Sequence, residues 1–414
     1  MKSFQKNENA IVQIDYIITI ESGYNMEKLL ITPKNLKIKQ ENVKITLKKM
    51  KEMKSNMKAN RKRKEHAMKV GIIGCGRVAQ TRHIPEYGAH PGAQIAGYYD
   101  FNEERARELA AVYGGKVYDS ADALLADRGI DAVSICTANH THAEITIKAL
   151  RSGKHVLCEK PMAVSLEECK AMVHAAAENN RQLMIGQNQR FAKAHIRAKE
   201  LLLADTIGKV LTFKTTFGHG GPETWSIDGA NSWFFDKERA SMGAMADLGV
   251  HKTDLIQYLL GQKVVAVTAQ MLTLDKRYES GELIGVDDNA ICIYEMEDGA
   301  IGTMTASWTY YGKEDNSTVL YGTKGIMKIY DDPEHSISVV LKNGERILYD
   351  IDKIQTNDNQ TKSGIIDAFV DALEAGTEVP VSGSDVLSAM EAVFACLESG
   401  REKRRIAIGE KGER

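Results

Sequence analysis

Three small residues that follow a short apolar run provide the first chemical hypothesis. The run Lys69–Ile73 leads directly into the pattern Gly74-x-Gly76-x-x-Ala79. Gly74 permits a tight turn and Gly76 lets the backbone approach a pyrophosphate. Ala79 lets the next helix pack closely on the strand while its N-terminal amides face the phosphates. Because the pattern stands between an apolar strand and a helix, it predicts a dinucleotide-binding turn.

A carboxylate after the second apolar run bears on which dinucleotide is bound. Asp100 directly follows the predicted strand Gln94–Tyr99. There it can accept hydrogen bonds from the adenosine ribose hydroxyls, and it would repel a 2′-phosphate. Arg77 and Arg105 carry the opposite charge and would soften that preference. We therefore predict that the cofactor is NAD and not NADP.

Four further motifs follow the glycine turn along the chain. They are Thr137-x-Asn139-x-x-His142, Glu159-Lys160-Pro161, Gln189-Arg190-Phe191 and Asp247-x-Gly249-x-His251-x-x-Asp254. Together with the glycine turn, and in this order, they resemble the Gfo/Idh/MocA oxidoreductases over about residues 68–409. The chain departs from the family at Gln189, where the usual motif is Arg-Arg-Phe.

The resemblance implies a role for each of these motifs. The residues expected at the cofactor are Gly74, Gly76, Arg77, Val78, Asp100, Thr137, Asn139, His142, Glu159, Lys160 and Arg190. Within this set, His142 is expected to pack near the cofactor, and Glu159 to contact the nicotinamide ribose or ring. The residues expected to act in catalysis and to contact the substrate are Lys160, Asp247 and His251.

The chemistry of the last three residues suits hydride transfer from a secondary alcohol. That reaction needs a general base for the hydroxyl proton and a positive group near the developing alkoxide. His251 suits the base role because imidazole titrates near neutral pH, and the charge of Lys160 would keep it neutral. Asp247 precedes His251 by four residues on a predicted helix, Ala244–Leu260, so its carboxylate can orient the ring or contact a second substrate hydroxyl. We expect no metal, because ligands at 247, 251 and 254 on one helix do not easily close a compact shell.

Residues 219–235 contain the aromatic side chains with which a sugar is commonly bound. Two of the three tryptophans in the chain, Trp225 and Trp233, lie there among glycines and polar residues. Aromatic faces can hold the C–H surface of a sugar while polar groups bind its hydroxyls. Trp233 is therefore the fourth predicted substrate contact, with packing in the core as the alternative.

These residues predict an NAD-dependent dehydrogenase acting on a secondary hydroxyl of a sugar, glycoside or inositol-like polyol. One alternative is an enzyme that retains NAD and cleaves a glycosidic bond through transient oxidation. Another is a non-enzymatic regulator that senses a sugar or dinucleotide on the same scaffold.

Two different sheets must position these groups. Up to residue 190, short apolar runs alternate with helical segments, which predicts a doubly wound Rossmann-type parallel sheet. Its strands are expected at Lys69–Ile73, Gln94–Tyr99, Lys116–Tyr118, Ala132–Cys136, His155–Cys158 and Gln182–Ile185. From residue 191 onward, hairpin signals such as Asn343-Gly344 predict a mostly antiparallel, open-faced sheet with helices on one face. The resemblance implies that this sheet pairs subunits into a homodimer or homotetramer.

We expect three segments: a basic extension over residues 1–67, an NAD-binding domain over 68–190, and a substrate-binding and oligomerisation domain over 191–414. Between Lys34 and Lys64 there are thirteen Lys or Arg residues against two Glu. This run could be a nucleic-acid arm or a membrane-surface segment, but it contains no aromatic residue for base stacking, so a disordered, solvated extension is favoured. Six scattered cysteines and the absence of a long apolar stretch predict a cytoplasmic protein with no membrane partner.

Overall fold

The first sheet, sheet A, is built entirely from parallel strands. The computed structural model describes residues 67–353 and 362–409, so the predicted extension lies outside the described residues except for Ala67. Sheet A has the strand order β3-β2-β1-β4-β5-β6, so the direction in which successive strands are added reverses between β1 and β4. Ligands of doubly wound sheets bind outside the carboxyl ends of the strands at such a reversal. The strands are β1 (Met68–Ile73), β2 (Ala93–Tyr99), β3 (Lys116–Val117), β4 (Ala132–Ile135), β5 (His155–Cys158) and β6 (Leu183–Ile185).

Helices connect these strands, as parallel pairing requires. They are α2 (Ile84–Ala89), α3 (Glu103–Tyr113), α4 (Ala121–Ala126), α5 (His142–Arg151) and α6 (Leu166–Glu178). The sequence Ser165-Leu166-Glu167-Glu168 predicts a capping box at the start of α6, and only half of that box forms. The hydroxyl of Ser165 accepts from the amide of Glu168, but the Glu168 carboxylate accepts from the amide of Val164 and not from Ser165.

The second sheet, sheet B, has nine strands in the order β14-β13-β12-β11-β7-β10-β9-β8-β15. All its neighbours pair antiparallel except β7 and β10, which run parallel. Its strands are β7 (Val210–Gly218), β8 (Val264–Leu272), β9 (Asn289–Met296), β10 (Ile301–Ser307), β11 (Thr318–Gly322), β12 (Gly325–Ile329), β13 (Ile337–Leu341), β14 (Arg346–Tyr349) and β15 (Ile406–Ala407). The predicted fold class is therefore confirmed. The sequence missed β15, which is too short to show a periodic pattern.

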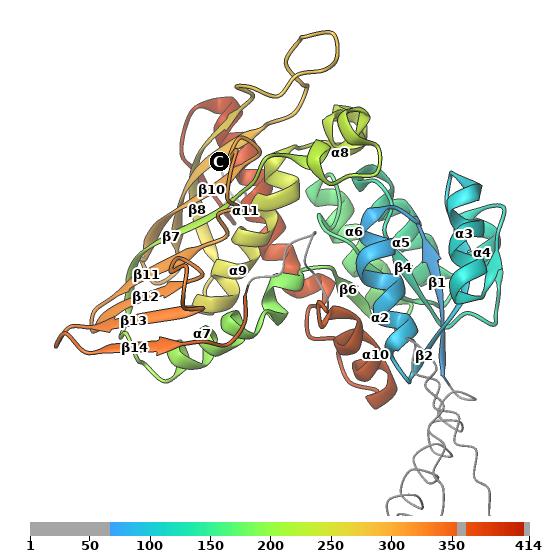
Figure 1. Cartoon of the computed structure of the whole chain (residues 1–414), viewed down its shortest axis with the longest axis horizontal. Coiled ribbons are helices and arrows are strands. Elements are labelled where there is room, and N and C mark those ends of the chain that lie inside the picture. The colour runs from blue at the N-terminus through green and yellow to red at the C-terminus, as the bar shows by residue number, and fades with distance from the viewer. Residues whose placement is uncertain (1–66, 354–361, 410–414) are drawn as a thin grey trace, which may run out of the picture. The chain divides into compact units, whose positions relative to one another are not determined.

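Helices cover one face of sheet B, with α9 packed on β7 and α11 packed along β8 (Figure 1). The helices that follow sheet A are α7 (Lys193–Leu203), α8 (Lys237–Ala240), α9 (Val250–Leu260), α10 (Ile365–Ala375) and α11 (Gly383–Glu402). None of the helices in the described ranges is long and apolar enough to cross a membrane. Because α11 also packs on α6, the last helix ties the two sheets together.

The predicted helix Ala244–Leu260 is divided in the structure. Its first part, Met245–Gly249, is a π-helical turn, and the regular helix α9 starts at Val250. Turns of this kind are rare and are frequently found at functional sites. Asp247 lies within the turn and His251 just beyond it, so the helical spacing assumed from the sequence does not apply between them.

Candidate active site

The glycine turn after β1 has the geometry that its residue types predict. Gly74 has a φ of +92°, and a Cβ there would lie 2.6 Å from the backbone carbonyl carbon and oxygen of Cys136. At Gly76, by contrast, a Cβ would meet no protein atom within 4 Å. Ala79 is fully buried and starts a π-helical turn, Ala79–His83, where an ordinary α-helix was expected. The chain therefore needs Gly74 for its own fold, whereas the open space at Gly76 suits the approach of a phosphate group.

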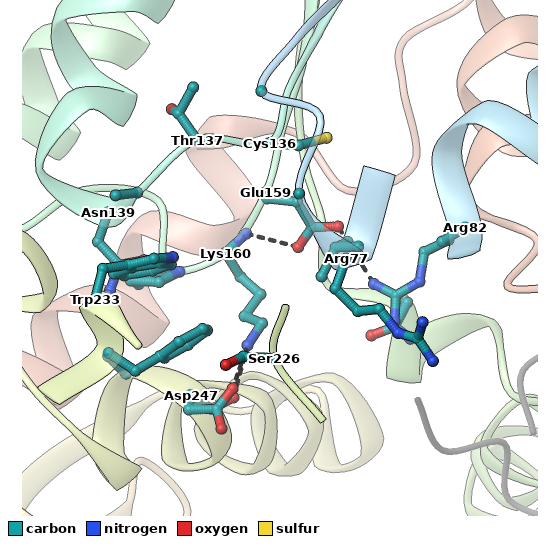
Figure 2. Close-up of a pocket in the computed structure, with 18 of the residues that line it drawn as sticks. Arg77, Arg82, Cys136, Thr137, Asn139, Glu159, Lys160, Ser226, Trp233 and Asp247 are labelled. Carbon is teal, nitrogen blue, oxygen red and sulfur yellow. Dashed lines mark hydrogen bonds and ion pairs between the residues drawn. The ribbon is translucent and has the colours of Figure 1, made fainter. Parts of the chain in front are cut away.

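A cavity of about 1620 Å³ extends from this turn to the helices of sheet B. Its volume exceeds the roughly 300–1,000 Å³ of a typical ligand pocket, so it has room for a cofactor and a substrate together. Figure 2 shows residues from both halves of the fold projecting into it. Of the predicted site residues, those that line it are Gly74, Gly76, Arg77, Val78, Asp100, Thr137, Asn139, Glu159, Lys160, Trp233, Asp247 and His251.

Asp100 is anchored at the rim of the glycine turn. One carboxylate oxygen accepts from the backbone amide of Cys75 at 2.6 Å and the other from that of Asn102 at 2.7 Å. Each oxygen keeps a lone pair that can accept from a ribose hydroxyl. The two amides hold the carboxylate in one orientation, so the predicted ribose contact is geometrically available.

Two predicted cofactor residues do not line the cavity. Arg190 forms a two-pronged ion pair with Asp254, at 2.7 Å from Nε and 2.5 Å from Nη2, so its guanidinium joins the segment before α7 to α9. His142 lies behind the cavity, with Nδ1 2.8 Å from the carbonyl of Pro161 and Nε2 3.1 Å from that of Thr137. Burial lowers the pKa of His142, and a neutral ring donates to only one of the two. Both residues thus bond to other parts of the protein and do not line the cavity, so their predicted places at the cofactor stay predictions.

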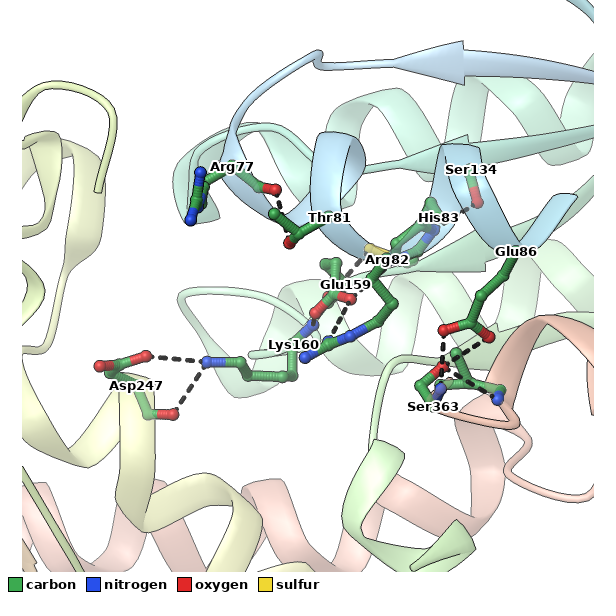
Figure 3. Close-up of polar contacts among 12 residues, drawn as sticks. Arg77, Thr81, Arg82, His83, Glu86, Ser134, Glu159, Lys160, Asp247 and Ser363 are labelled. Atoms are coloured by element: carbon green, nitrogen blue, oxygen red, sulfur yellow. Dashed lines mark hydrogen bonds and ion pairs between the residues drawn. The ribbon is translucent and has the colours of Figure 1, made fainter. Parts of the chain in front are cut away.

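Glu159 is the centre of a buried charge network that the sequence did not reveal. Its Oε1 lies 2.8 Å from Nε2 of His83 and 3.3 Å from Nη1 of Arg82 (Figure 3). Its Oε2 accepts from the backbone amide of Lys160 at 3.2 Å. Burial raises the pKa of Glu159, but the His83 hydrogen bond and the charges of Arg82, His83 and Lys160 outweigh it and hold the pKa well below its usual range. Glu159 is therefore a fixed anion beneath the backbone of Lys160.

Lys160 and Asp247 meet across the cavity, one from the end of β5 and one from the π-helical turn (Figures 2 and 3). Nζ of Lys160 donates to the Asp247 backbone carbonyl at 2.8 Å and to its Oδ1 at 3.0 Å. Nε1 of Trp308 donates to the other carboxylate oxygen at 3.0 Å. Nε2 of His219 lies 3.7 Å from that same oxygen. Burial raises the pKa of Asp247, but the charges of Lys160 and His219 dominate and lower it. The carboxylate thus stays ionised and holds the ammonium group in place.

His251 faces the cavity and is 6% exposed. Burial, followed by the charges of Lys160 and Arg82, lowers its pKa well below 6.5. The ring is therefore neutral near pH 7 and can accept a proton. Of the two roles predicted for Asp247, the bond that would orient the His251 ring does not form, and the contact to a substrate hydroxyl stays a prediction. Nδ1 of His251 has no protein partner, and Phe217 packs on the ring at 6.1 Å between centroids.

Trp233 is only half-buried and stands in an aromatic cluster at the edge of the cavity. Its ring stacks on Phe234 at 4.1 Å and 21°, and Phe234 in turn meets Trp308 edge-on at 6.5 Å. Through Phe234, this cluster connects residues 219–235 to Trp308, whose indole nitrogen donates to Asp247. This position agrees with both predictions for Trp233, the substrate contact and the packing role. The ring packs on Phe234, and the residue also lines the cavity.

Trp308, His219 and His83 are site residues that the sequence analysis did not identify. They come from the end of β10, the end of β7 and the first turn after the glycine motif. Trp308 stands alone in sequence, so only its register beside β9 and β7 brings it under Asp247. In the described part of the chain, no group of three or more His, Cys, Asp or Glu residues is arranged to hold a metal ion.

Comparisons with known proteins match both halves of the chain. A family profile described as an oxidoreductase family with an NAD-binding Rossmann fold matches residues 68–187, and the GFO/IDH/MocA C-terminal domain matches residues 195–328. Levoglucosan dehydrogenase of Pseudarthrobacter phenanthrenivorans is 33% identical over 290 residues, which cover 62% of this chain and 72% of the relative. Myo-inositol 2-dehydrogenase of Thermotoga maritima is 27% identical over 351 residues, covering 83% and 99%.

Solved structures agree with these sequence matches. A levoglucosan dehydrogenase in complex with NADH and levoglucosan superposes with a TM-score of 0.74 at 26% identity, covering 83% of this chain and all of the other. An aldose-aldose oxidoreductase from Caulobacter crescentus gives 0.70 at 25% identity over the same shares. The similarity of the chain to these oxidoreductases therefore extends over both sheet A and sheet B.

Proposed function

Since the chain belongs to the Gfo/Idh/MocA family of oxidoreductases, we propose that it transfers a hydride between NAD and a secondary hydroxyl of a sugar, glycoside or polyol. The observation that carries the proposal is the meeting of Lys160, Asp247 and His251 in the same cavity as the glycine turn. The predicted dinucleotide-binding turn and the predicted acid–base residues therefore line the same cavity.

The proposed mechanism gives each of these side chains a separate task. When bound, the nicotinamide ring supplies the hydride acceptor. His251, kept neutral by burial and by the charge of Lys160, takes the hydroxyl proton. The ammonium group of Lys160 stabilises the negative charge that develops on the substrate oxygen. Asp247 holds that ammonium group through its carbonyl and carboxylate.

Asp247 acts in this scheme as a positioning residue. Its carboxylate accepts from Lys160 on one oxygen and from Trp308 on the other, so both oxygens are oriented before substrate enters. Such preorganised dipoles do not have to rearrange as charge develops. Trp308→Phe should therefore lower kcat while leaving the KM for NAD unchanged.

The preference for NAD is proposed from Asp100. Its two oxygens are oriented by backbone amides toward the rim of the turn, where they can accept from ribose hydroxyls. A 2′-phosphate at that position would meet a carboxylate of the same charge.

A substrate screen tests the function. Inositols, free hexoses, levoglucosan and alkyl glucosides are incubated with NAD or NADP, and the absorbance of the reduced cofactor is followed. We expect reduction of NAD with at least one of these compounds, and a loss of about 10²–10⁴-fold in kcat for His251→Ala. If glycosides are cleaved without net NADH, the NAD-retaining alternative replaces the dehydrogenase. Binding without any turnover would instead favour a regulator.

Homo-oligomerisation through sheet B is proposed from the side chains on its outer face. Ile291 and Ile293 on β9 and Ile301 on β10 are each nearly half exposed. Neighbouring exposed aliphatic residues on a sheet favour burial against another surface. Light scattering after size exclusion should give a dimer or larger, and a monomer at micromolar concentration would contradict this.

A further inference from the structure

The end of the cavity next to Asp100 contains an ion pair that joins distant parts of the chain. Nη2 of Arg105, on the first turn of α3, donates to Oδ1 of Asp228 at 2.9 Å. The two residues are 123 positions apart. Asp228 lies in the segment 221–236, which approaches the cavity from the sheet B half of the fold.

Arg105 lies close enough to Asp100 for the two charges to act on the same group. The backbone of Arg105 donates to Asn102, whose own amide donates to the Asp100 carboxylate. The pKa of the Cys75 thiol, which burial raises to about 12, is also raised by Asp100 and lowered by Arg105. Arg105, Asp100 and Asp228 all line the cavity. An arginine at this position is a candidate partner for a 2′-phosphate, because guanidinium binds phosphate in a two-pronged geometry.

We propose that Asp228 is a cofactor-specificity residue, which favours NAD over NADP by engaging the guanidinium of Arg105 that would otherwise bind a 2′-phosphate. The proposal rests on the NAD-linked function above and adds a residue from the opposite half of the fold to it. Asp100 disfavours the phosphate directly, whereas Asp228 withholds the positive charge that would attract it.

The ion pair contributes little to the stability of the fold, so a change in cofactor binding on its removal would not come from destabilisation of the protein. The side chains of Arg105 and Asp228 are 27% and 42% exposed. Exposed pairs of this kind stabilise proteins only weakly. Asp228→Asn should therefore leave the melting temperature close to that of the wild type.

Titration calorimetry with NAD and with NADP tests the proposal without requiring turnover. In Asp228→Asn we expect the Kd for NADP to fall about five- to tenfold, which corresponds to roughly 1–1.4 kcal/mol from a charge-assisted contact. The Kd for NAD should stay within about twofold. Adding Arg105→Gln to this variant should remove most of the gain. Glu238→Gln is the matched control, because it removes one exposed negative charge from the adjoining helix α8.

Three outcomes would overturn the proposal. The first is an unchanged ratio of the NAD and NADP dissociation constants in Asp228→Asn. The second is a gain in NADP affinity that survives Arg105→Gln or also appears in Glu238→Gln, because general loss of negative charge would then explain it. The third is an equal weakening of NAD and NADP binding, which would show that the ion pair only holds the two segments together. A failed sugar screen with an intact shift in binding would refute the dehydrogenase and leave the role of Asp228 standing.

Discussion

Replacing Lys160 by methionine tests the proposed chemistry most directly. The change removes the ammonium group, which donates to Asp247 at 2.8 and 3.0 Å, and keeps most of the aliphatic stem. Loss of one donor that stabilises a developing oxyanion lowers kcat by about 10²–10³-fold. We expect a loss of that size in NADH formation at pH 8, with the substrate found in the screen.

The same substitution should also move the pH dependence. The charge of Lys160 is the largest influence after burial in lowering the pKa of His251. Oxidation needs neutral His251, so activity is lost as the pH falls through the pKa of that ring. Without Lys160 the pKa rises, and the acid limb of kcat/KM should shift to higher pH. Lys160→Arg retains the charge and should keep the limb near its wild-type position.

Two results would refute this reasoning. One is a Lys160→Met enzyme within about tenfold of wild-type kcat, because the oxyanion-stabilising role requires a larger loss. The other is an acid limb that moves equally in Lys160→Met and Lys160→Arg, since charge would then not be its cause.

Four further perturbations have distinct expected outcomes. Gly74→Ala should lower the melting temperature and abolish NAD binding in calorimetry, because φ is +92° and the added Cβ would lie 2.6 Å from the Cys136 backbone. Gly76→Ala, by contrast, should fold normally and bind NAD about tenfold more weakly. Trp233→Ala should raise the substrate KM about tenfold and reduce stability by only about 1 kcal/mol; a lower melting temperature with unchanged KM would show that the ring only packs. Deleting residues 1–67 should leave the Kd for NAD within about twofold, and loss of binding would assign this segment a role at the site.

Most of the sheet architecture could be predicted from the sequence because strands and their turns are marked by local patterns. Each of the six strands predicted for sheet A starts and ends within one residue of its observed limit. The hairpin at Asn343-Gly344 joins β13 to β14 as expected, with Gly344 at a φ of +89°. The π-helical turn before α9 was missed because it carries the same apolar spacing as an ordinary helix. The proposed boundary between domains at residues 190 and 191 stays a prediction.

The sequence by itself determined the glycine turn, Asp100 after β2 and the chemical identities of Lys160, Asp247 and His251. These depend on residue type and on spacing along one turn or strand end. Only the tertiary structure decided which side chains these and the neighbouring residues contact. It joined Arg190 to Asp254, set Trp308 against Asp247, and brought Asp228 to Arg105. Such contacts join residues 61 to 123 positions apart. They follow from sheet register and helix packing, which no local pattern of residues encodes.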